Sequence, residues 1–332
     1  SSVLIVGYYG FANAGDDYLL LQTLRRHISL LSSGRVNILY RCKKISKGTI
    51  LLDGMSYSVT YVPRKSYISI FCALLRVTEI SFGGGSLFQD KTSILSFLYY
   101  SMIVCVGKMM RRQINFYGQG FGPMTSRLSK AIFPLILKQV DTLEVRDRES
   151  LGYCEVVKNR VVPRLTMDMS FQRVDKFNDS YDEDGVIALS LKEETFTASV
   201  LEALRASSTD PWIFIEAHRQ VDFKKEWKKQ LSISNDRLLD FTYILNNELS
   251  SPVPLSMIVS MRFHVCAWAV MTGVPFLAIS DDPKLLQLAK QFGQPFINPQ
   301  EDTVSGVKIR HNLRPKKYRT HLIENRETYL CR

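Results

Sequence analysis

Arginine, histidine and lysine side chains stand where three helices are predicted to begin, directly after apolar segments. They are Arg146, Arg148, Arg262, His264 and Lys284. A cation in the first turn opposes the helix dipole and costs about 0.3–1 kcal/mol. A bound anion would offset that cost, because helix amino ends and forked arginine donors both favour phosphate and carboxylate groups. The spacing therefore predicts a site for a compact dianion that carries both groups, although each cation alone also fits a surface ion pair.

Histidines and aspartates near these positions could move protons. His264 is predicted at a helix start, where the dipole disfavours its proton and a bound phosphate would restore it, and His218 follows a strand predicted to end at Ile215. We predict His264 as the first candidate for a general acid. Four aspartates could serve as general bases toward a sugar hydroxyl: Asp16, Asp17, Asp168 and Asp222. The first two fit equally well as the cap of the first helix.

Three glycine-rich turns follow predicted strands, at 7–17, 83–86 and 118–123. Such turns let backbone N–H groups approach a ligand closely, although glycines also serve tight turns. None of them matches the dinucleotide fingerprint or the phosphate-binding loop of nucleotide hydrolases, so no nicotinamide cofactor is expected. The residues predicted to line a cleft beside these turns or to contact an acceptor are Gly10, Asn13, Gly84, Gly85, Gln119, Asp168 and His218.

Neither a metal centre nor a disulfide scaffold is expected. The six cysteines, at 42, 72, 105, 154, 266 and 331, include no CxxC pair. The sequence holds no HxxxH or HExxH motif, no paired-carboxylate spacing and no GxSxG nucleophile elbow. We therefore predict no metal and no cofactor, and a reducing, cytoplasmic setting. No signal or transit segment is recognised.

The elements that must position these residues alternate between strand and helix. Strands are predicted over 3–6, 36–40, 78–82, 114–117, 142–145, 186–190, 212–215, 258–261 and 274–279, and turns or apolar-periodic helices follow them. This alternation favours parallel sheets whose turns share the carboxyl edge. The fold class predicted is α/β, with two Rossmann-like doubly wound domains that face each other across a cleft, as in GT-B glycosyltransferases.

A length of 332 residues favours two domains. We place an N-terminal domain over 1–172, a polar linker over 173–185, a C-terminal domain over 186–305 and a basic tail over 306–332. The apolar run 94–107 is shorter than the roughly 18–20 residues that a membrane-spanning helix needs. It is predicted as a buried crossover helix, with a membrane-surface contact as the alternative.

The net charge of +11 favours an anionic partner. The tail contributes 8 − 2 = +6, from eight Lys or Arg and two Glu between 306 and 332. A solvated face explains such a run, and contact with acidic lipid at the inner face of a membrane is the alternative. Nucleic acid is not expected as a partner, because no nucleic-acid-binding motif accompanies the charge.

Six segments in order carry a family resemblance. They are GYYGFANAGDDYLLLQTL (7–24), FGGGSLFQD (82–90), GQGFGPM (118–124), VRDRES (145–150), TMDMSF (166–171) and SMRFH…GVPFLAISDDPK (260–284). Together they resemble the polysaccharide pyruvyl transferase family. The resemblance implies a GT-B-like fold and transfer of the enolpyruvyl group of phosphoenolpyruvate to two hydroxyls of a sugar, which forms a cyclic pyruvate ketal. The implied acceptors are bacterial surface glycans or their lipid-linked precursors.

The resemblance also assigns roles to residues. It implies that Arg146 or Arg148, Arg262 and Lys284 bind phosphoenolpyruvate, and His264 occupies the histidine of its MR-x-H motif. One departure is Asp281, where the family pattern leads us to expect an aromatic residue. Two other functions stay open at this point: a GT-B glycosyltransferase that uses a nucleotide-sugar donor, and a non-catalytic scaffold that binds anionic lipid or glycan through the basic tail.

Overall fold

The computed structural model describes the chain except for residues 53, 92, 158–159, 172–178, 193–199, 201, 203–211, 218–237, 242–243, 245–250, 301–311, 313 and 331–332. The chain divides into two compact units. Unit 1 comprises Ser1–Phe11 and Asp16–Gln172, and unit 2 comprises Ala12–Gly15 and Arg173–Arg332. The short segment 12–15 therefore packs with unit 2, although the chain on either side of it belongs to unit 1.

Unit 1 is built on an eight-stranded sheet in the order β3-β4-β2-β1-β5-β6-β7-β8. Its strands are β1 (Val3–Tyr9), β2 (Val36–Tyr40), β3 (Ser46–Leu52), β4 (Met55–Pro63), β5 (Glu79–Gly83), β6 (Gln113–Gln119), β7 (Thr142–Val145) and β8 (Arg164–Leu165). Pairings between these strands are parallel except that of β3 with β4. Parallel neighbours place the turns after β1, β5, β6 and β7 at one edge, as the sequence predicts.

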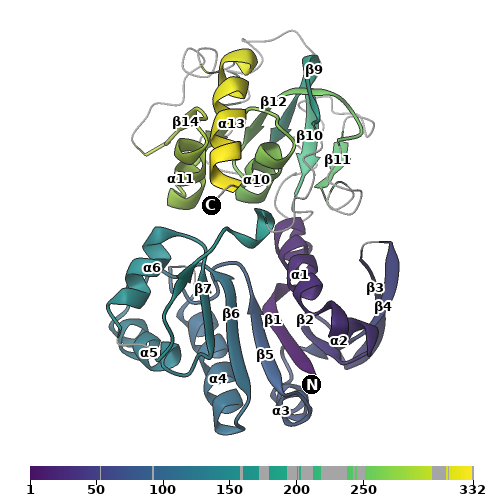
Figure 1. Cartoon of the computed structure of the whole chain (residues 1–332), viewed down its shortest axis with the longest axis vertical. Coiled ribbons are helices and arrows are strands. Elements are labelled where there is room, and N and C mark those ends of the chain that lie inside the picture. Colours follow the sequence, from purple (N-terminus) through teal and green to yellow (C-terminus); the bar gives the residue numbers. More distant parts are fainter. Residues whose placement is uncertain are drawn as a thin grey trace. The chain divides into compact units, whose positions relative to one another are not determined.

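The helices of unit 1 cover both faces of this sheet (Figure 1). They are α1 (Ala14–Arg26), α2 (Ile28–Ser32), α3 (Tyr67–Arg76), α4 (Ile94–Met109), α5 (Arg127–Leu137) and α6 (Arg148–Glu155), with a 3₁₀ turn, η1, at Met169–Phe171. The apolar run that opens the chain serves both faces. Leu4 and Val6 pack with α3, α4 and α5, whereas Val3 and Ile5 pack with α1 and α2. A strand buried on both sides needs such an uninterrupted apolar run.

Side-chain caps fix where several of these helices begin. Ser93 accepts a hydrogen bond from the Ser96 N–H before α4, Ser126 accepts one from Ser129 before α5, and Asp147 accepts one from Ser150 before α6. Each cap satisfies an N–H group that the helix leaves without a partner. Because α4, α5 and α6 follow the parallel strands β5, β6 and β7, these locally encoded helix starts lie at the carboxyl edge of the sheet.

Unit 2 holds a six-stranded sheet in the order β11-β10-β9-β12-β13-β14, and the pairings of these strands are parallel. Its strands are β9 (Tyr181–Ser190), β10 (Trp212–Glu216), β11 (Leu238–Asp240), β12 (Leu255–Ser260), β13 (Phe276–Ile279) and β14 (Phe296–Ile297). The helices named for this unit are α10 (Phe263–Met271), α11 (Pro283–Gln291) and α13 (Pro315–Leu330). The predicted α/β class with two mostly parallel sheets is confirmed.

Three features differ from the sequence prediction. The antiparallel hairpin β3–β4 was not anticipated, and β9 begins at Tyr181, inside the range predicted as a linker. The range predicted as a basic tail contains helix α13, on which Leu322 is fully buried. Arg319 forms an ion pair with Asp179 at 2.5 Å, so part of the positive charge there serves the packing of unit 2. In the part of the chain that the structure describes, no helix is long and apolar enough to cross a bilayer.

Candidate functional site

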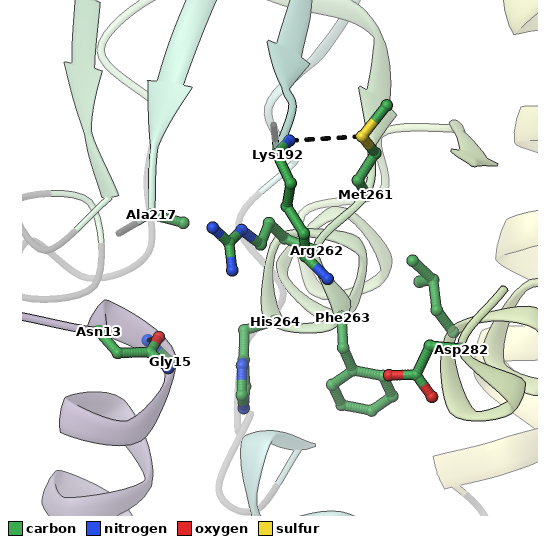
Figure 2. Close-up of a pocket in the computed structure, with 10 residues that line it drawn as sticks. Asn13, Gly15, Lys192, Ala217, Met261, Arg262, Phe263, His264 and Asp282 are labelled. Atoms are coloured by element: carbon green, nitrogen blue, oxygen red, sulfur yellow. Dashed lines mark hydrogen bonds between the residues drawn. The ribbon is translucent and has the colours of Figure 1, made fainter. Parts of the chain in front are cut away.

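A small cavity of about 160 Å³ lies within unit 2, beside the first turn of α10 (Figure 2). Its lining consists of Asn13, Gly15, Lys192, Ala217, Met261, Arg262, Phe263, His264, Asp282 and Leu285. A cavity of about 150 Å³ in another protein holds a benzene molecule, so this volume is large enough for a small ligand. Three of the lining side chains are basic or can become cationic, so the cavity suits a compact anion.

Arg262 is placed by the turn between β12 and α10. The Ser260 hydroxyl accepts a hydrogen bond from the Arg262 N–H at 2.9 Å and donates one to the Arg262 carbonyl at 3.2 Å. Arg262 is the N-cap residue of α10 and makes no side-chain cap bond, since a guanidinium cannot accept one. At α11, in contrast, the N-cap Asp282 accepts a bond from the Lys284 N–H. The amino end of α10 therefore carries cationic side chains at positions where most helices carry side chains that accept hydrogen bonds from the backbone.

His264 is held against the backbone of the segment that begins α1. The Asn13 Oδ1 atom accepts a hydrogen bond from the Gly15 N–H at 3.2 Å, and the Ala14 N–H donates to the Ala217 carbonyl at 3.0 Å. A Cβ atom added at Gly15 would stand 2.0 Å from Nδ1 of His264. Only glycine leaves room for the imidazole at this position, so the glycine turn predicted to serve a ligand also serves the candidate acid.

Lys192 also lines the cavity, although it is not among the site residues predicted from the sequence. It follows β9 by two residues, and its backbone N–H lies 3.3 Å from the Met261 sulfur. Figure 2 shows its side chain reaching down toward the first turn of α10, while the Arg262 guanidinium points toward Ala217. Its place directly after a predicted strand was a signal that could have found it, because such positions fall at the ligand-binding edge of a parallel sheet.

Lys284 is not among the residues that line this cavity. It is the second residue of α11, and its backbone N–H donates to Asp282 Oδ1 at 3.0 Å. Its neighbours Asp282 and Leu285 do line the cavity. His218 and Asp222, which were predicted as an acid and a base, lie outside the described residues.

A second group of predicted residues gathers in unit 1, at the carboxyl ends of β6 and β7. The Arg146 guanidinium donates to Asp168 Oδ2 at 3.0 Å and to Ser86 Oγ at 2.9 Å, and its Nε lies 3.4 Å from Asp147. The side chains of Arg146 and Asp168 are only 8% and 6% exposed. Arg146 is therefore a nearly buried, paired guanidinium rather than a mobile surface cation.

The glycine turns of unit 1 surround this arginine. The Gly120 N–H donates to the Gly85 carbonyl at 2.7 Å, and Gln119 Nε2 donates to the Gly84 carbonyl at 2.9 Å. A Cβ added at Gly120 would stand 2.8 Å from Arg146 Nε. The structure thus brings together five predicted residues: Gly84, Gly85, Gln119, Arg146 and Asp168. Arg148, by contrast, is exposed at the first position of α6.

The predicted bases Asp16 and Asp17 stand in the first turn of α1, within unit 1. Burial raises the pKa of the Asp17 carboxyl above its ordinary value, and a hydrogen bond with the Gly10 backbone opposes that shift. Gly10 itself has φ +83°, and a Cβ there would meet the Tyr40 ring at 2.7 Å. A carboxylate with a raised pKa is a stronger base than an ordinary aspartate, which fits the role predicted for it.

Aromatic rings and arginines gather beside Gly10. Tyr8 and Phe11 stack with ring centroids 3.9 Å apart, and the Arg64 guanidinium lies 4.8 Å from the Phe11 centroid. Arg41 lies 5.1 Å from the same ring. Flat apolar rings flanked by cations suit a sugar ring that bears a negative group. Within the described residues no group of three or more His, Cys, Asp or Glu is arranged to hold a metal ion.

A match to a protein-family model shows which family the chain belongs to. The family model described as polysaccharide pyruvyl transferase matches residues 13–245. The chain belongs to the polysaccharide pyruvyl transferase family. The match spans Asn13, Arg146 and Asp168, whereas Arg262, His264 and Lys284 lie beyond its end. No curated protein matches the sequence significantly.

Solved structures similar to this chain share its fold at low sequence identity. Sucrose-phosphate synthase from Thermosynechococcus elongatus aligns over 100% of this chain and 94% of its own, with 11% identity and a TM-score of 0.54. The wall teichoic acid polymerase TagF aligns over 100% and 84%, with 10% identity and a TM-score of 0.55. UDP-GlcNAc 2-epimerase from Neisseria meningitidis aligns over 98% and 95%, with 12% identity and a TM-score of 0.53. The predicted GT-B-like fold is confirmed.

Proposed function

We propose that this member of the polysaccharide pyruvyl transferase family moves the enolpyruvyl group of phosphoenolpyruvate onto two hydroxyls of a glycan sugar, so that a cyclic pyruvate ketal forms. The observation that carries the proposal is the cation-lined cavity at the amino end of α10, together with membership of the family. Phosphoenolpyruvate is a compact acid phosphate whose carboxylate and phosphate both need cationic partners. Arg262 and Lys192 line the cavity and would bind these groups, and the α10 dipole would add to their attraction.

His264 is the proposed general acid. It would protonate the methylene carbon of phosphoenolpyruvate, so that positive charge develops at the neighbouring carbon and a sugar hydroxyl attacks there. The bond from that carbon to the phosphate oxygen then breaks, and the second hydroxyl closes the ketal. The two sugar hydroxyls release two protons. One replaces the proton that the acid gave to the methylene carbon, and the other leaves with the phosphate. No oxidant or reductant is needed.

The unit 1 residues keep the roles that the sequence analysis expects of them. Asp16 or Asp17 is the proposed base for the sugar hydroxyl, and the raised pKa of Asp17 supports this choice. Arg146 and Arg148 are proposed donor ligands, with Asp168 orienting Arg146 through the 3.0 Å hydrogen bond. Lys284 is proposed to assist the donor from the first turn of α11. The stacked pair Tyr8 and Phe11 is the proposed platform for the acceptor sugar.

Ligand titration tests the donor. Phosphoenolpyruvate at a hundredfold excess over its Kd should stabilise the full chain by about 2.7 kcal/mol, whereas UDP-glucose at the same concentration should not. Replacing Arg262 by Ala should abolish the shift, and Arg314→Ala, at an exposed arginine of the same unit, should preserve it. Stabilisation by UDP-glucose and not by phosphoenolpyruvate would instead identify a nucleotide-sugar transferase.

Mass spectrometry of an acceptor glycan tests the reaction. After incubation with phosphoenolpyruvate, the acceptor should gain the mass of pyruvic acid less one water, and one phosphate should be released for each ketal. An open enolpyruvyl ether or ester adds the same mass but leaves one of the two hydroxyls free. A product of this mass that can still be acetylated at one of the two hydroxyls would therefore contradict ketal formation.

A further inference from the structure

Helix α3 presents an apolar face to solvent. Tyr67, Ile68, Phe71 and Leu75 are 64%, 79%, 50% and 53% exposed. At 100° per residue these four positions fall within one side of the helix. The adjoining side, with Ile70 and Leu74, is buried in the core of unit 1. The helix is therefore apolar on both sides, and only one side has a partner within the chain.

Helix α4 repeats this property over a greater length. Phe97 and Ile103 on its inner side are fully buried, whereas Leu95 and Met109 on its outer side are 74% and 84% exposed. A helix that is apolar all round is normally buried on every side. Scattered exposed apolar residues need no explanation, but a whole outer stripe does.

The two stripes lie on one surface. α3, α4 and α5 all pack in the same core cluster, against the same face of the sheet. The Tyr99 hydroxyl of α4 donates to the Arg64 carbonyl just before α3 at 2.8 Å, and Arg112 after α4 donates to the Leu75 carbonyl of α3 at 3.1 Å. Helix α5 adds Leu128 and Leu135, 48% and 59% exposed. We call the outer side of these three helices the α3–α5 face.

The charge of the α3–α5 face has one sign. The sequences of α3, α4 and α5 contain Arg76, Lys108, Arg127 and Lys130, and no aspartate or glutamate. Exposed Lys65, Lys91 and Arg111 lie at or near the helix ends. Of the carboxylates beside the face, Asp90 accepts bonds from Thr125 and Ser126, and Asp141 pairs with Lys108 at 2.8 Å. A lipid bilayer with acidic headgroups complements such a surface, because the headgroups attract the cations at its border and the hydrocarbon beneath them accepts the apolar side chains.

We propose that the α3–α5 face docks on an anionic lipid bilayer, with the apolar stripes entering the headgroup region and the basic residues contacting lipid phosphate. A protein partner would more often supply carboxylates at defined positions, whereas this face offers exposed apolar area with cations at its border. Each Lys or Arg near an anionic surface contributes about 1 kcal/mol, so the border alone gives a substantial attraction. The inference is independent of the reaction proposed above.

The face also fits lipid better than the basic segment 306–332 does. On α13, Arg319 is paired with Asp179, and Arg326 Nη1 lies 3.4 Å from the Val270 and Met271 carbonyls. These two cations support the packing of unit 2. The α3–α5 face combines exposed charge with exposed apolar area, which stable docking on a membrane requires.

Vesicle sedimentation of the full chain tests the proposal. The chain should bind vesicles of phosphatidylcholine mixed with phosphatidylglycerol, and bind phosphatidylcholine alone at least about tenfold more weakly. The double variant Ile68→Glu with Phe71→Glu should lose at least about tenfold in affinity for the mixed vesicles, because two apolar contacts become charges that the surface repels. A matched control is Val156→Glu with Val162→Glu, at valines of unit 1 that are 89% and 81% exposed and lie off the face.

The control should bind within about threefold of the parent, since its charge change is equal but lies outside the three helices that form the face. Circular dichroism should show that both variants fold, because the altered side chains are exposed. Equal loss in test and control, or no binding by the parent chain, would overturn the proposal. A third result would also overturn it: the parent chain binds no vesicles but forms concentration-dependent dimers, and the double variant Ile68→Glu with Phe71→Glu is monomeric. The face would then pair with a second copy of the chain.

Discussion

The backbone of Gly15 lies directly against the imidazole of His264, so close that a Cβ atom at Gly15 would stand 2.0 Å from Nδ1. Both residues line the same cavity, which also contains the Arg262 side chain. The first glycine turn of the chain is therefore coupled to a histidine about 250 positions later through steric contact. This contact makes the position of the proposed acid sensitive to a single methyl group.

Replacing Gly15 by Ala should displace His264 and lower turnover with phosphoenolpyruvate about a hundredfold, since a misplacement of about 1 Å can cost that much. The measurement is kcat at saturating donor. Gly152→Ala is the matched control, because a Cβ at Gly152 meets nothing within 4 Å. Gly152 lies in α6, where Ala should stabilise the helix and leave turnover unchanged. Similar turnover for the two variants would show that the His264 position does not matter.

His264→Ala should reduce kcat by about 10²–10⁴-fold, the usual contribution of acid catalysis, while binding of phosphoenolpyruvate changes much less. Calorimetric titration and steady-state kinetics separate the two effects. His321→Ala, at an exposed histidine on α13, is the control. A kcat within tenfold of the parent would remove His264 as the acid, and an equal loss of donor affinity would make it a binding residue instead.

Sequence patterns predicted the elements of the sheets better than the partners of the site residues. Apolar runs such as Val3–Val6 must be buried on both faces, so strand positions and the parallel class could be inferred locally. The hairpin β3–β4 was missed because β3 alternates exposed and half-buried residues and carries little apolar signal. Helix α13 was missed because its many charges suggested a solvated tail.

The partners of Arg146 could not be read from the sequence. The position of Arg146 after β7 was predictable from the strand, but its pairing with Asp168 depends on how the chain returns to the sheet after β8. The same holds for Lys192, which reaches the cavity only because β9 and β12 are neighbours. Long-range pairing of this kind is set by topology, and short motifs do not contain it.

Asp168→Asn should destabilise unit 1 by up to about 3–5 kcal/mol, because it removes the nearer of the two carboxylates that pair with the nearly buried Arg146 and leaves only Asp147, at 3.4 Å. Urea denaturation measures the change. Glu183→Gln, which alters the exposed pair with Lys316, is the control and should leave the unfolding midpoint unchanged, since exposed pairs contribute little. Equal effects of the two substitutions would mean that Arg146 is solvated and that Asp168 does not hold it.

Asp90 should make the stability of the chain fall at acid pH. Burial raises the pKa of its carboxyl, but hydrogen bonds from the Thr125 and Ser126 backbone and side chains of Ser129 and Thr125 outweigh that effect, so its pKa lies well below the ordinary value. A folded-state pKa below the unfolded value of about 3.9 stabilises the fold above that pH. The contribution is lost as the pH falls through 3.9 toward the lower folded-state pKa.

Asp90→Asn removes both the charge and one acceptor, so it should lower stability at pH 7 by about 1–3 kcal/mol. Urea unfolding between pH 7 and pH 3 should show the difference between parent and variant narrowing below about pH 4, where Asp90 takes up a proton in the unfolded parent but stays ionised in the folded one. Other carboxylates, such as Asp179 with its lowered pKa, titrate in both proteins and cancel in this difference. A difference that stays constant across the range would mean that Asp90 acts through hydrogen-bond geometry alone, and that its charge adds nothing to the fold.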